Sequence, residues 1–189
     1  MKLKLYNCDD HLKIISLRNH EKVYNIETLI HSVKKLVDLQ KKVICLIYGS
    51  GPETKNLKKL SEDLGIQNQI LFRGRYQQDE LPYIFSIMNC YVSTSLSDAG
   101  ISASTAEAMS CELPSISANN SENSSWINHG KTGFLFENKN SDELSNILLN
   151  LKKFDLSKIG IESRKTILKK NDYTNEMRKV EIIYNNLVK

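Results

Sequence analysis

The sequence has few of the residues that mark fibrous, disordered or membrane-spanning chains. Its 189 residues include 3 prolines and 8 glycines, too few for a collagen-like or low-complexity protein. No apolar run approaches the roughly 20 residues that a membrane-spanning helix requires. The first ten residues, MKLKLYNCDD, lack the apolar core of a secretory signal. These absences predict one globular domain, with the cytoplasm as its expected location.

Cysteine is also scarce, and its spacing argues against a metal or disulfide framework. The four cysteines show no Cys-x-x-Cys pair, and Cys45 and Cys90 lie in apolar runs typical of buried strands. We therefore expect buried, reduced thiols. The four histidines are scattered along the chain, and His20 has no second ligand at metal-binding spacing. No metal site is expected.

Arginine is the third shortage, because lysine supplies 21 of the 26 basic residues. The lysines lie along predicted helices, beside glutamate and aspartate, and aromatic residues are not interleaved with them. Nucleic-acid-binding faces concentrate arginine and lysine on one side instead. The net charge of +4 is therefore interpreted as a solvated surface, and no nucleic-acid partner is expected.

Short apolar runs alternate with segments whose apolar residues recur at helical spacing. Strands are expected at 12–17, 43–48, 69–72, 90–94, 115–118 and 133–136. Helices are expected at 25–37, 57–64, 79–87, 102–111, 122–128 and 141–152, with two more in 155–189 that separate near Asn171. Gly65 should end the second helix, and Asp79 and Ser141 should cap theirs. No hairpin signal joins two strands, so the pattern predicts a doubly wound α/β domain: a mostly parallel sheet with helices on both faces.

Ligands of such sheets bind outside the carboxyl ends of the strands. Arg18 and Lys22 follow the first expected strand, where they could hold an anion or belong to a solvated loop. Gly49, Ser50 and Gly51 follow the second. These glycines permit a tight turn close to a ligand, but the stretch is neither a GxxxxGK nor a GxGxxG motif, and a plain strand-to-helix turn fits it as well.

The stretch from Ser95 to Met109 carries the most chemical information. Asp98 precedes Gly100, Ile101 and Ser102 at the start of an expected helix, where free amides and the helix dipole favour a phosphate group. Glu107 follows inside the helix. Carboxylates accept hydrogen bonds from sugar hydroxyls, so a diphosphate joined to two sugars would fit. The alternative is an ordinary helix start with a solvent-facing Glu107.

Several short motifs together resemble one enzyme family. They are Arg18, Gly49-Ser50-Gly51-Pro52, Phe72-Arg73-Gly74, Asp79-Glu80-Leu81-Pro82, Ser93-Thr94-Ser95, Glu107-Ala108-Met109, Leu113-Pro114 and Trp126-x-x-x-Gly130-x-x-Gly133-Phe134-Leu135. Their order resembles the C-terminal, donor-binding domain of family-4 retaining glycosyltransferases of the GT-B fold. The resemblance covers nearly the whole chain.

The resemblance implies transfer of a sugar from a UDP-sugar or GDP-sugar to an acceptor hydroxyl with retention of configuration, without a metal or other cofactor. The catalytic residues it implies are Arg18, Asp98 and Glu107. The donor-binding residues it implies are Arg18, Lys22, Gly49, Ser50, Gly51, Gly74, Arg75, Asp98, Gly100, Ile101, Ser102 and Glu107. In this assignment Arg18 holds the diphosphate, Glu107 contacts the ribose and Asp98 contacts the transferred sugar.

The sequence departs from the family pattern at three positions. The family's second diphosphate-binding cation would fall on Tyr24, so that cation is absent unless Lys22 reaches the site. The first acidic residue would fall on Ala99, and we expect Asp98 to replace it. Glu112 stands where a glycine is usual, which predicts a less flexible turn with unchanged chemistry.

The resemblance also implies that 1–189 is one lobe of a two-lobe enzyme and is inactive alone. An acceptor glycan or lipid-linked glycan would bind through an absent N-terminal domain, and peripheral membrane association of the full-length enzyme is compatible with this. Helices in 155–189 would pack on this domain or on the absent one through an apolar stripe of Tyr173, Met177, Val180, Ile183, Tyr184 and Leu187. The alternatives are half of a nucleotide-sugar epimerase, a non-catalytic nucleotide-sugar-binding module and a receiver-like interaction domain.

Overall fold

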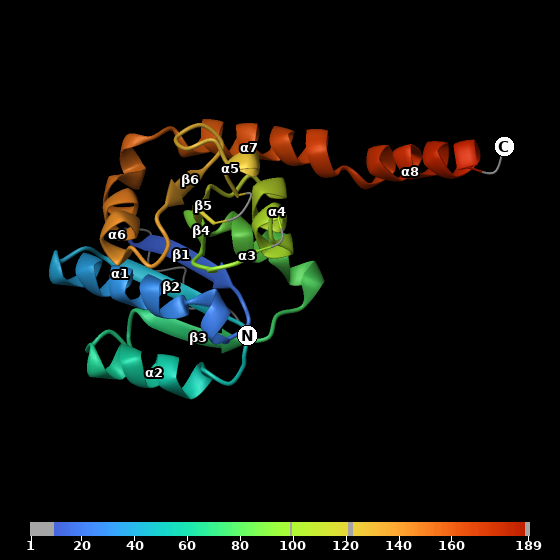
Figure 1. The fold of residues 1–189 in the computed structure, drawn as a ribbon. Coiled ribbons are helices and arrows are strands. Elements are labelled where there is room, and N and C mark those ends of the chain that lie inside the picture. The colour runs from blue at the N-terminus through green and yellow to red at the C-terminus, as the bar shows by residue number, and fades with distance from the viewer. Residues whose placement is uncertain (1–9, 99, 121–122, 188–189) are drawn as a thin grey trace.

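A computed structural model describes residues 10–98, 100–120 and 123–187. Within these ranges, six parallel strands form one sheet in the order β3-β2-β1-β4-β5-β6 (Figure 1). The strands are β1 (Leu12–Leu17), β2 (Val43–Tyr48), β3 (Ile70–Gly74), β4 (Cys90–Ser93), β5 (Ser115–Ala118) and β6 (Phe134–Phe136). The chain runs outward from β1 to β3, then returns to place β4 on the other side of β1. The strand order therefore reverses between β1 and β4, which is where ligands of such sheets bind.

Helices cover both faces of the sheet, which confirms the predicted doubly wound α/β fold. The helices are α1 (Ile26–Asp38), α2 (Thr54–Asp63), α3 (Leu81–Ser86), α4 (Ala103–Ser110), α5 (Asn123–Trp126), α6 (Ser141–Asn150), α7 (Leu156–Asn171) and α8 (Tyr173–Leu187). Short 3-10 turns are η1 (Lys22–Tyr24), η2 (Gln78–Glu80) and η3 (Leu151–Lys153). Buried residues of α1, α2 and α6 share one hydrophobic core with the strands, and those of α3 and α4 share the other.

Alternating side chains of the central strand divide between these two cores. Ile14 of β1 packs among α1 and α6, and its neighbour Ile15 packs among α3 and α4. Both are fully buried. This is why the strand predicted at 12–17 is apolar on both faces, as strands inside a helix-covered parallel sheet are. Because β1 is central and rigid, the residue that follows it is held firmly in place.

The prediction of buried thiols is confirmed for Cys45 and Cys90, which are free and fully buried. Cys111 is also free, but it is only partly buried. Burial raises the pKa of the Cys90 thiol to about 12, and it raises that of Cys45 as well. Both thiols therefore remain protonated at neutral pH. Cys8 lies outside the described residues.

Two predicted helix caps are wrong. The segment expected to begin at Asp79 starts with η2, and the Glu80 side chain accepts a hydrogen bond from the Gln77 backbone N–H at 3.3 Å. Helix α6 begins at Ser141 but is capped by the preceding residue, because the Asn140 side chain accepts from the Glu143 N–H at 2.9 Å. The N-caps are therefore Gln77 and Asn140, and each precedes the residue that the sequence had indicated.

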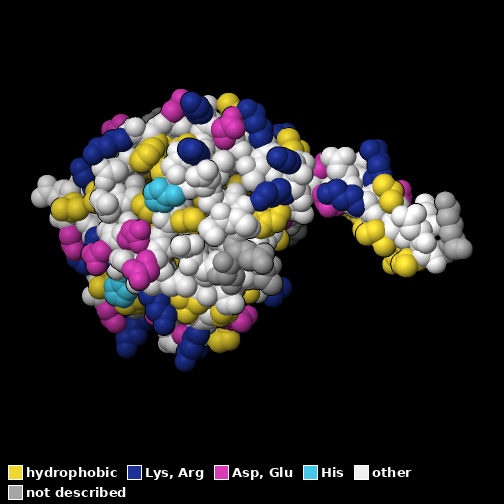
Figure 2. All heavy atoms as spheres, turned by 45° about the horizontal axis from the view of Figure 1, so that its top comes forward, with side chains coloured by type: hydrophobic (Ala, Val, Ile, Leu, Met, Phe, Trp, Pro, Cys, Tyr) yellow, Lys and Arg dark blue, Asp and Glu magenta, His cyan; other side chains and the backbone are white. Residues whose placement is uncertain are grey.

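The last helices divide where the sequence predicted, but they behave differently. Helix α7 packs against α4. In the turn that follows α4, the Glu112 carbonyl lies so close to the Gly160 Cα that an added Cβ would lie 2.1 Å from its oxygen. Helix α8 extends away from the body of the domain and buries none of its described residues (Figure 1). Hydrophobic side chains gather along one side of it (Figure 2). No helix of the described ranges is long and apolar enough to cross a bilayer.

Candidate functional site

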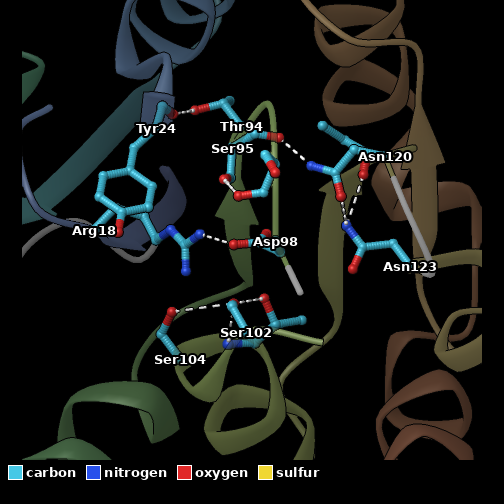
Figure 3. Close-up of polar contacts among 12 residues, drawn as sticks. Arg18, Tyr24, Thr94, Ser95, Asp98, Ser102, Ser104, Asn120 and Asn123 are labelled. Carbon is cyan, nitrogen blue, oxygen red and sulfur yellow. Dashed lines mark hydrogen bonds and ion pairs between the residues drawn. The ribbon is translucent and has the colours of Figure 1, made fainter. Parts of the chain in front are cut away.

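The candidate site lies at the carboxyl ends of β1 and β4, where the strand order reverses. Arg18 directly follows β1, and Asp98 lies in the loop that follows β4. The Arg18 guanidinium donates to the Asp98 carboxylate, and the two form an ion pair (Figure 3). Each side chain is only 9% exposed. The predicted cation and carboxylate are therefore brought together, and each neutralises the other.

Tyr24 completes the surroundings of Arg18. Its ring lies under the guanidinium, with the Arg18 Cζ 4.4 Å from the ring centroid. The Tyr24 carbonyl accepts from the Thr94 hydroxyl at 2.8 Å, which ties the segment after β1 to the end of β4. An aromatic ring thus occupies the position where the family resemblance led us to expect a lysine.

The loop between β4 and Asp98 is held from both sides. Leu96 N–H donates to the Val23 carbonyl at 2.8 Å. On the opposite side, the Asn120 side-chain amide donates to the Ser95 carbonyl. Asn123 in turn donates to the Asn120 side chain at 3.0 Å. The two asparagines were missed in the sequence, where nothing but their place after the fifth strand marked them.

The N-terminus of α4 supplies donors on the same side of the sheet. Gly100 adopts a positive φ of 83°, and Ser102 caps the helix by accepting from the Thr105 N–H at 3.3 Å. The Ser104 hydroxyl is bonded instead to the buried Tyr91 hydroxyl at 2.8 Å. Because the first amides of a helix have no intrahelical acceptor, the start of α4 has the donors that an anion could use. Ile101 of this turn is partly buried.

Glu107 is partly buried inside α4 and accepts from the Gln78 side chain at 2.7 Å. It borders a hollow of about 420 Å³ between α3, α4 and α7. That hollow is also lined by Leu81, Phe85 and Ile167, and Arg18 and Asp98 do not border it. The structure therefore places Glu107 beside the η2 segment that follows β3.

The glycine turn after β2 supports the loop that carries Arg18. A Cβ on Gly49, whose φ is +111°, would lie 2.2 Å from the Arg18 carbonyl oxygen. A Cβ on Gly51 would lie 2.5 Å from the His20 carbonyl oxygen. Ser50 also contributes through its backbone, since its carbonyl accepts from the His20 N–H at 3.1 Å. These contacts explain why small residues are needed there without any ligand.

The other predicted cations differ from Arg18 in exposure. Lys22 and Arg75 are exposed, and neither pairs with an acidic residue of the described ranges. Gly74 adopts a positive φ of 69° beside Arg75, with open space around its Cα. Lys22 and Arg75 thus remain free to contact a ligand that extends beyond the ion pair.

His20 is a core residue and carries no metal-like environment among the described residues. It is fully buried, and its Nδ1 lies 2.8 Å from the Thr54 hydroxyl. Its ring meets Phe72 edge to face, and burial lowers its pKa below 6.5. In the described part of the chain its Nε2 has no partner. A neutral His20 therefore helps to hold the loop between Arg18 and η1.

Two departures from the family pattern have different outcomes. Glu112 adopts a positive φ of 60°, the left-handed conformation that a glycine would take without strain. The turn therefore keeps its shape despite the glutamate, and Gly160 packs closely against it. Ala99, where the first acidic residue was expected, lies outside the described residues.

The fold is a Rossmann-like α/β domain of the kind found in GT-B structures. The sequence agrees, because residues 5–167 match the family described as glycosyl transferases group 1. The chain belongs to that family, as the motifs led us to expect.

The individual relatives have low sequence identity to this chain. The chain is 25% identical over 153 residues to an uncharacterized glycosyltransferase of Methanocaldococcus jannaschii, covering 80% of this chain and 39% of the relative. It is 24% identical over 130 residues to a GDP-mannose-dependent phosphatidylinositol monomannoside mannosyltransferase of Mycobacterium tuberculosis, covering 66% and 33%. Among solved structures, HepE of Anabaena in complex with UDP superposes with a TM-score of 0.84 at 18% identity, covering 94% and 49%. The chain thus spans less than half the length of each of these proteins.

Proposed function

We propose that this chain is the donor-binding lobe of a retaining glycosyltransferase and that it binds a nucleoside-diphosphate sugar at the carboxyl ends of β1 and β4. The observation that carries the proposal is the placement of Arg18, a largely buried cation, at the point where the strand order reverses. The relatives support the ligand class: HepE has been solved with UDP and with UDP-glucose, and the mycobacterial relative depends on GDP-mannose.

The leaving diphosphate gains negative charge as the bond to the sugar breaks. Arg18 and the free amides at 100–102 would stabilise that charge, because preorganised donors act most strongly where charge develops. Donors fixed in this way can compensate the diphosphate without a divalent cation. We therefore expect transfer by the full-length enzyme to persist in EDTA.

The two carboxylates have separate parts in the proposal. Glu107 would hold the ribose hydroxyls, and its partner in the structure is the Gln78 side chain, which donates to it at 2.7 Å. Asp98 uses Oδ1 to bind Arg18, and its Oδ2 would accept from a hydroxyl of the transferred sugar. Lys22 and Arg75 would contact the outer parts of the donor.

The acceptor side requires chain outside these 189 residues. A GT-B cleft forms between two lobes, and one lobe is described here, so we expect nucleotide binding without sugar transfer. The apolar stripe on α8 has the character of a packing face, with Leu187 76% and Tyr173 78% exposed. We propose that it packs on the absent lobe, through which a glycan or lipid-linked glycan would be bound.

A thermal-shift series tests the donor proposal directly. The chain would be heated with UDP, GDP, ADP and their sugars, each with and without EDTA. A ligand at 100 times its dissociation constant stabilises the folded state by about 2.7 kcal/mol, which is a shift of several degrees for a domain of this size. Stabilisation by one nucleotide family, unchanged by EDTA, supports the proposal. No shift with any nucleotide at millimolar concentration would overturn it.

A further inference from the structure

Arg18 is restrained by two contacts. The Asp98 carboxylate binds one of its terminal nitrogens, and the Tyr24 ring lies 4.4 Å from its Cζ. Its Nε is buried and has no partner among the described residues. The ion pair limits rotation of the guanidinium, while the ring face blocks its movement out of plane. Neither contact alone would fix the group.

Tyr24 is itself held firmly in place. Its backbone N–H donates to the Glu21 carbonyl at 3.0 Å, and its own carbonyl accepts from Thr94 at 2.8 Å. The next residue, Asn25, takes a left-handed φ of 48° that ends η1 and starts α1. The ring is therefore presented by a short turn fixed at both ends, and its partly buried position limits its own rotation.

The charge balance gives this arrangement a consequence for binding. Asp98 compensates the charge of Arg18, and the aromatic ring adds attraction for the cation without adding a second full charge. Without the ring, the guanidinium could turn about its bond to Asp98 into solvent. An arginine held against the ring and bonded to Asp98 keeps its remaining N–H donors in place, where a phosphate group can accept from more than one of them.

We infer that Tyr24 is a positioning residue, which fixes the Arg18 guanidinium by stacking so that it can bind the donor diphosphate. The inference rests on the proposed function for its ligand. It assigns to the ring face, not to the hydroxyl, the task of holding Arg18 ready for binding.

The test compares Tyr24→Leu, which removes the ring, with Tyr24→Phe, which keeps it. Binding of UDP, GDP and inorganic pyrophosphate to the full chain would be measured by titration calorimetry. Tyr24→Leu should weaken binding of pyrophosphate and of the preferred nucleotide by about 2- to 30-fold, the range for a cation held by an aromatic ring. Tyr24→Phe should bind within about twofold of the parent chain. Tyr173→Leu on the exposed α8 is the matched control.

A second readout separates positioning from general loss of structure. The Arg18 Nε–H signal in a proton–nitrogen NMR spectrum, assigned by its absence in Arg18→Lys, should be shifted upfield by the ring in the parent chain and in Tyr24→Phe. It should move back downfield in Tyr24→Leu while other signals stay in place. Unchanged binding and an unchanged Arg18 signal in Tyr24→Leu would overturn the inference, as would equal losses in both variants. If the parent chain binds no nucleotide and no pyrophosphate, the proposed function fails, whereas the NMR result still decides whether Tyr24 holds Arg18.

Discussion

Arg18 and Asp98, separated by 80 residues in the sequence, form an ion pair that joins the end of β1 to the loop after β4. Both strands are central in the sheet, so the pair lies at the point where strand order reverses. In the proposed complex, the diphosphate would bind the same cation that Asp98 now pairs with. Such a ligand would share Arg18 with Asp98 or displace it.

Replacing Asp98 with asparagine should strengthen the binding of anions. The change removes a negative charge beside the diphosphate, and a unit charge about 4 Å away contributes about 1 kcal/mol even in water. Asp98→Asn should therefore bind UDP or GDP, whichever the chain prefers, and pyrophosphate about fivefold more tightly or better. The full sugar nucleotide should also lose part of its affinity advantage over the diphosphate, because asparagine offers the sugar hydroxyl no anionic acceptor. Calorimetry with the three ligands checks both effects, and weaker pyrophosphate binding would show that Asp98 mainly orients Arg18.

Replacing Glu107 with glutamine should distinguish the ribose from the phosphates. The variant keeps the shape and the contact with Gln78 but loses the charged acceptor for hydroxyl groups. The preferred nucleoside diphosphate should bind about 5- to 30-fold less tightly, since bonds to a charged group exceed neutral ones by about 1–2 kcal/mol. Pyrophosphate affinity should stay unchanged in the same titrations. An equal loss for both ligands would remove Glu107 from the ribose assignment.

The sequence predicted the six strands because they are short runs between helical segments, and the central ones, such as β1 and β2, are largely apolar and covered by helices on both faces. It also predicted which edge carries the candidate site. It could not show that Arg18 pairs with Asp98, because that contact depends on the return of the chain from β3 to β4. It could not show that the Tyr24 ring lies against Arg18, because the sequence marks Tyr24 only as the residue that stands where the family has a cation. The predicted caps at Asp79 and Ser141 are wrong because the position of an N-cap depends on the backbone angles of the residue before the helix, and the sequence does not show those angles.

His20 should make the fold less stable in mild acid. Burial lowers its pKa in the folded state below 6.5, so the unfolded chain binds the proton more strongly. The stabilising contribution is therefore complete above pH 6.5 and is lost as the pH falls below that value toward the folded pKa. Urea unfolding at intervals from pH 7.5 to 5 would measure it. His20→Gln should flatten this dependence, whereas the same change at exposed His31 should leave it as it is.

Gly49 should be intolerant of a side chain, because the Arg18 loop rests directly on it. An alanine Cβ would lie 2.2 Å from the Arg18 carbonyl oxygen and would also strain a φ of +111°. Gly49→Ala should lower the free energy of unfolding by at least about 2 kcal/mol. Gly65→Ala is the matched control, since its φ is also positive but no atom lies within 4 Å of the added Cβ. Equal losses of stability in the two variants, measured by urea unfolding, would contradict this account of the turn.

Titration of UDP, GDP and pyrophosphate into the parent chain and into Arg18→Ala tests the central claim most directly. If Arg18 holds the diphosphate, the variant loses a charge-assisted bond of about 1.5–3 kcal/mol, which corresponds to about ten- to hundredfold weaker binding. Lys22→Ala, the control at the nearby exposed cation, should lose much less. Circular dichroism would establish that both variants remain folded. The account predicts the large loss for Arg18→Ala with nucleotide and pyrophosphate alike, and equal affinity of Arg18→Ala and the parent chain for all three ligands would contradict it.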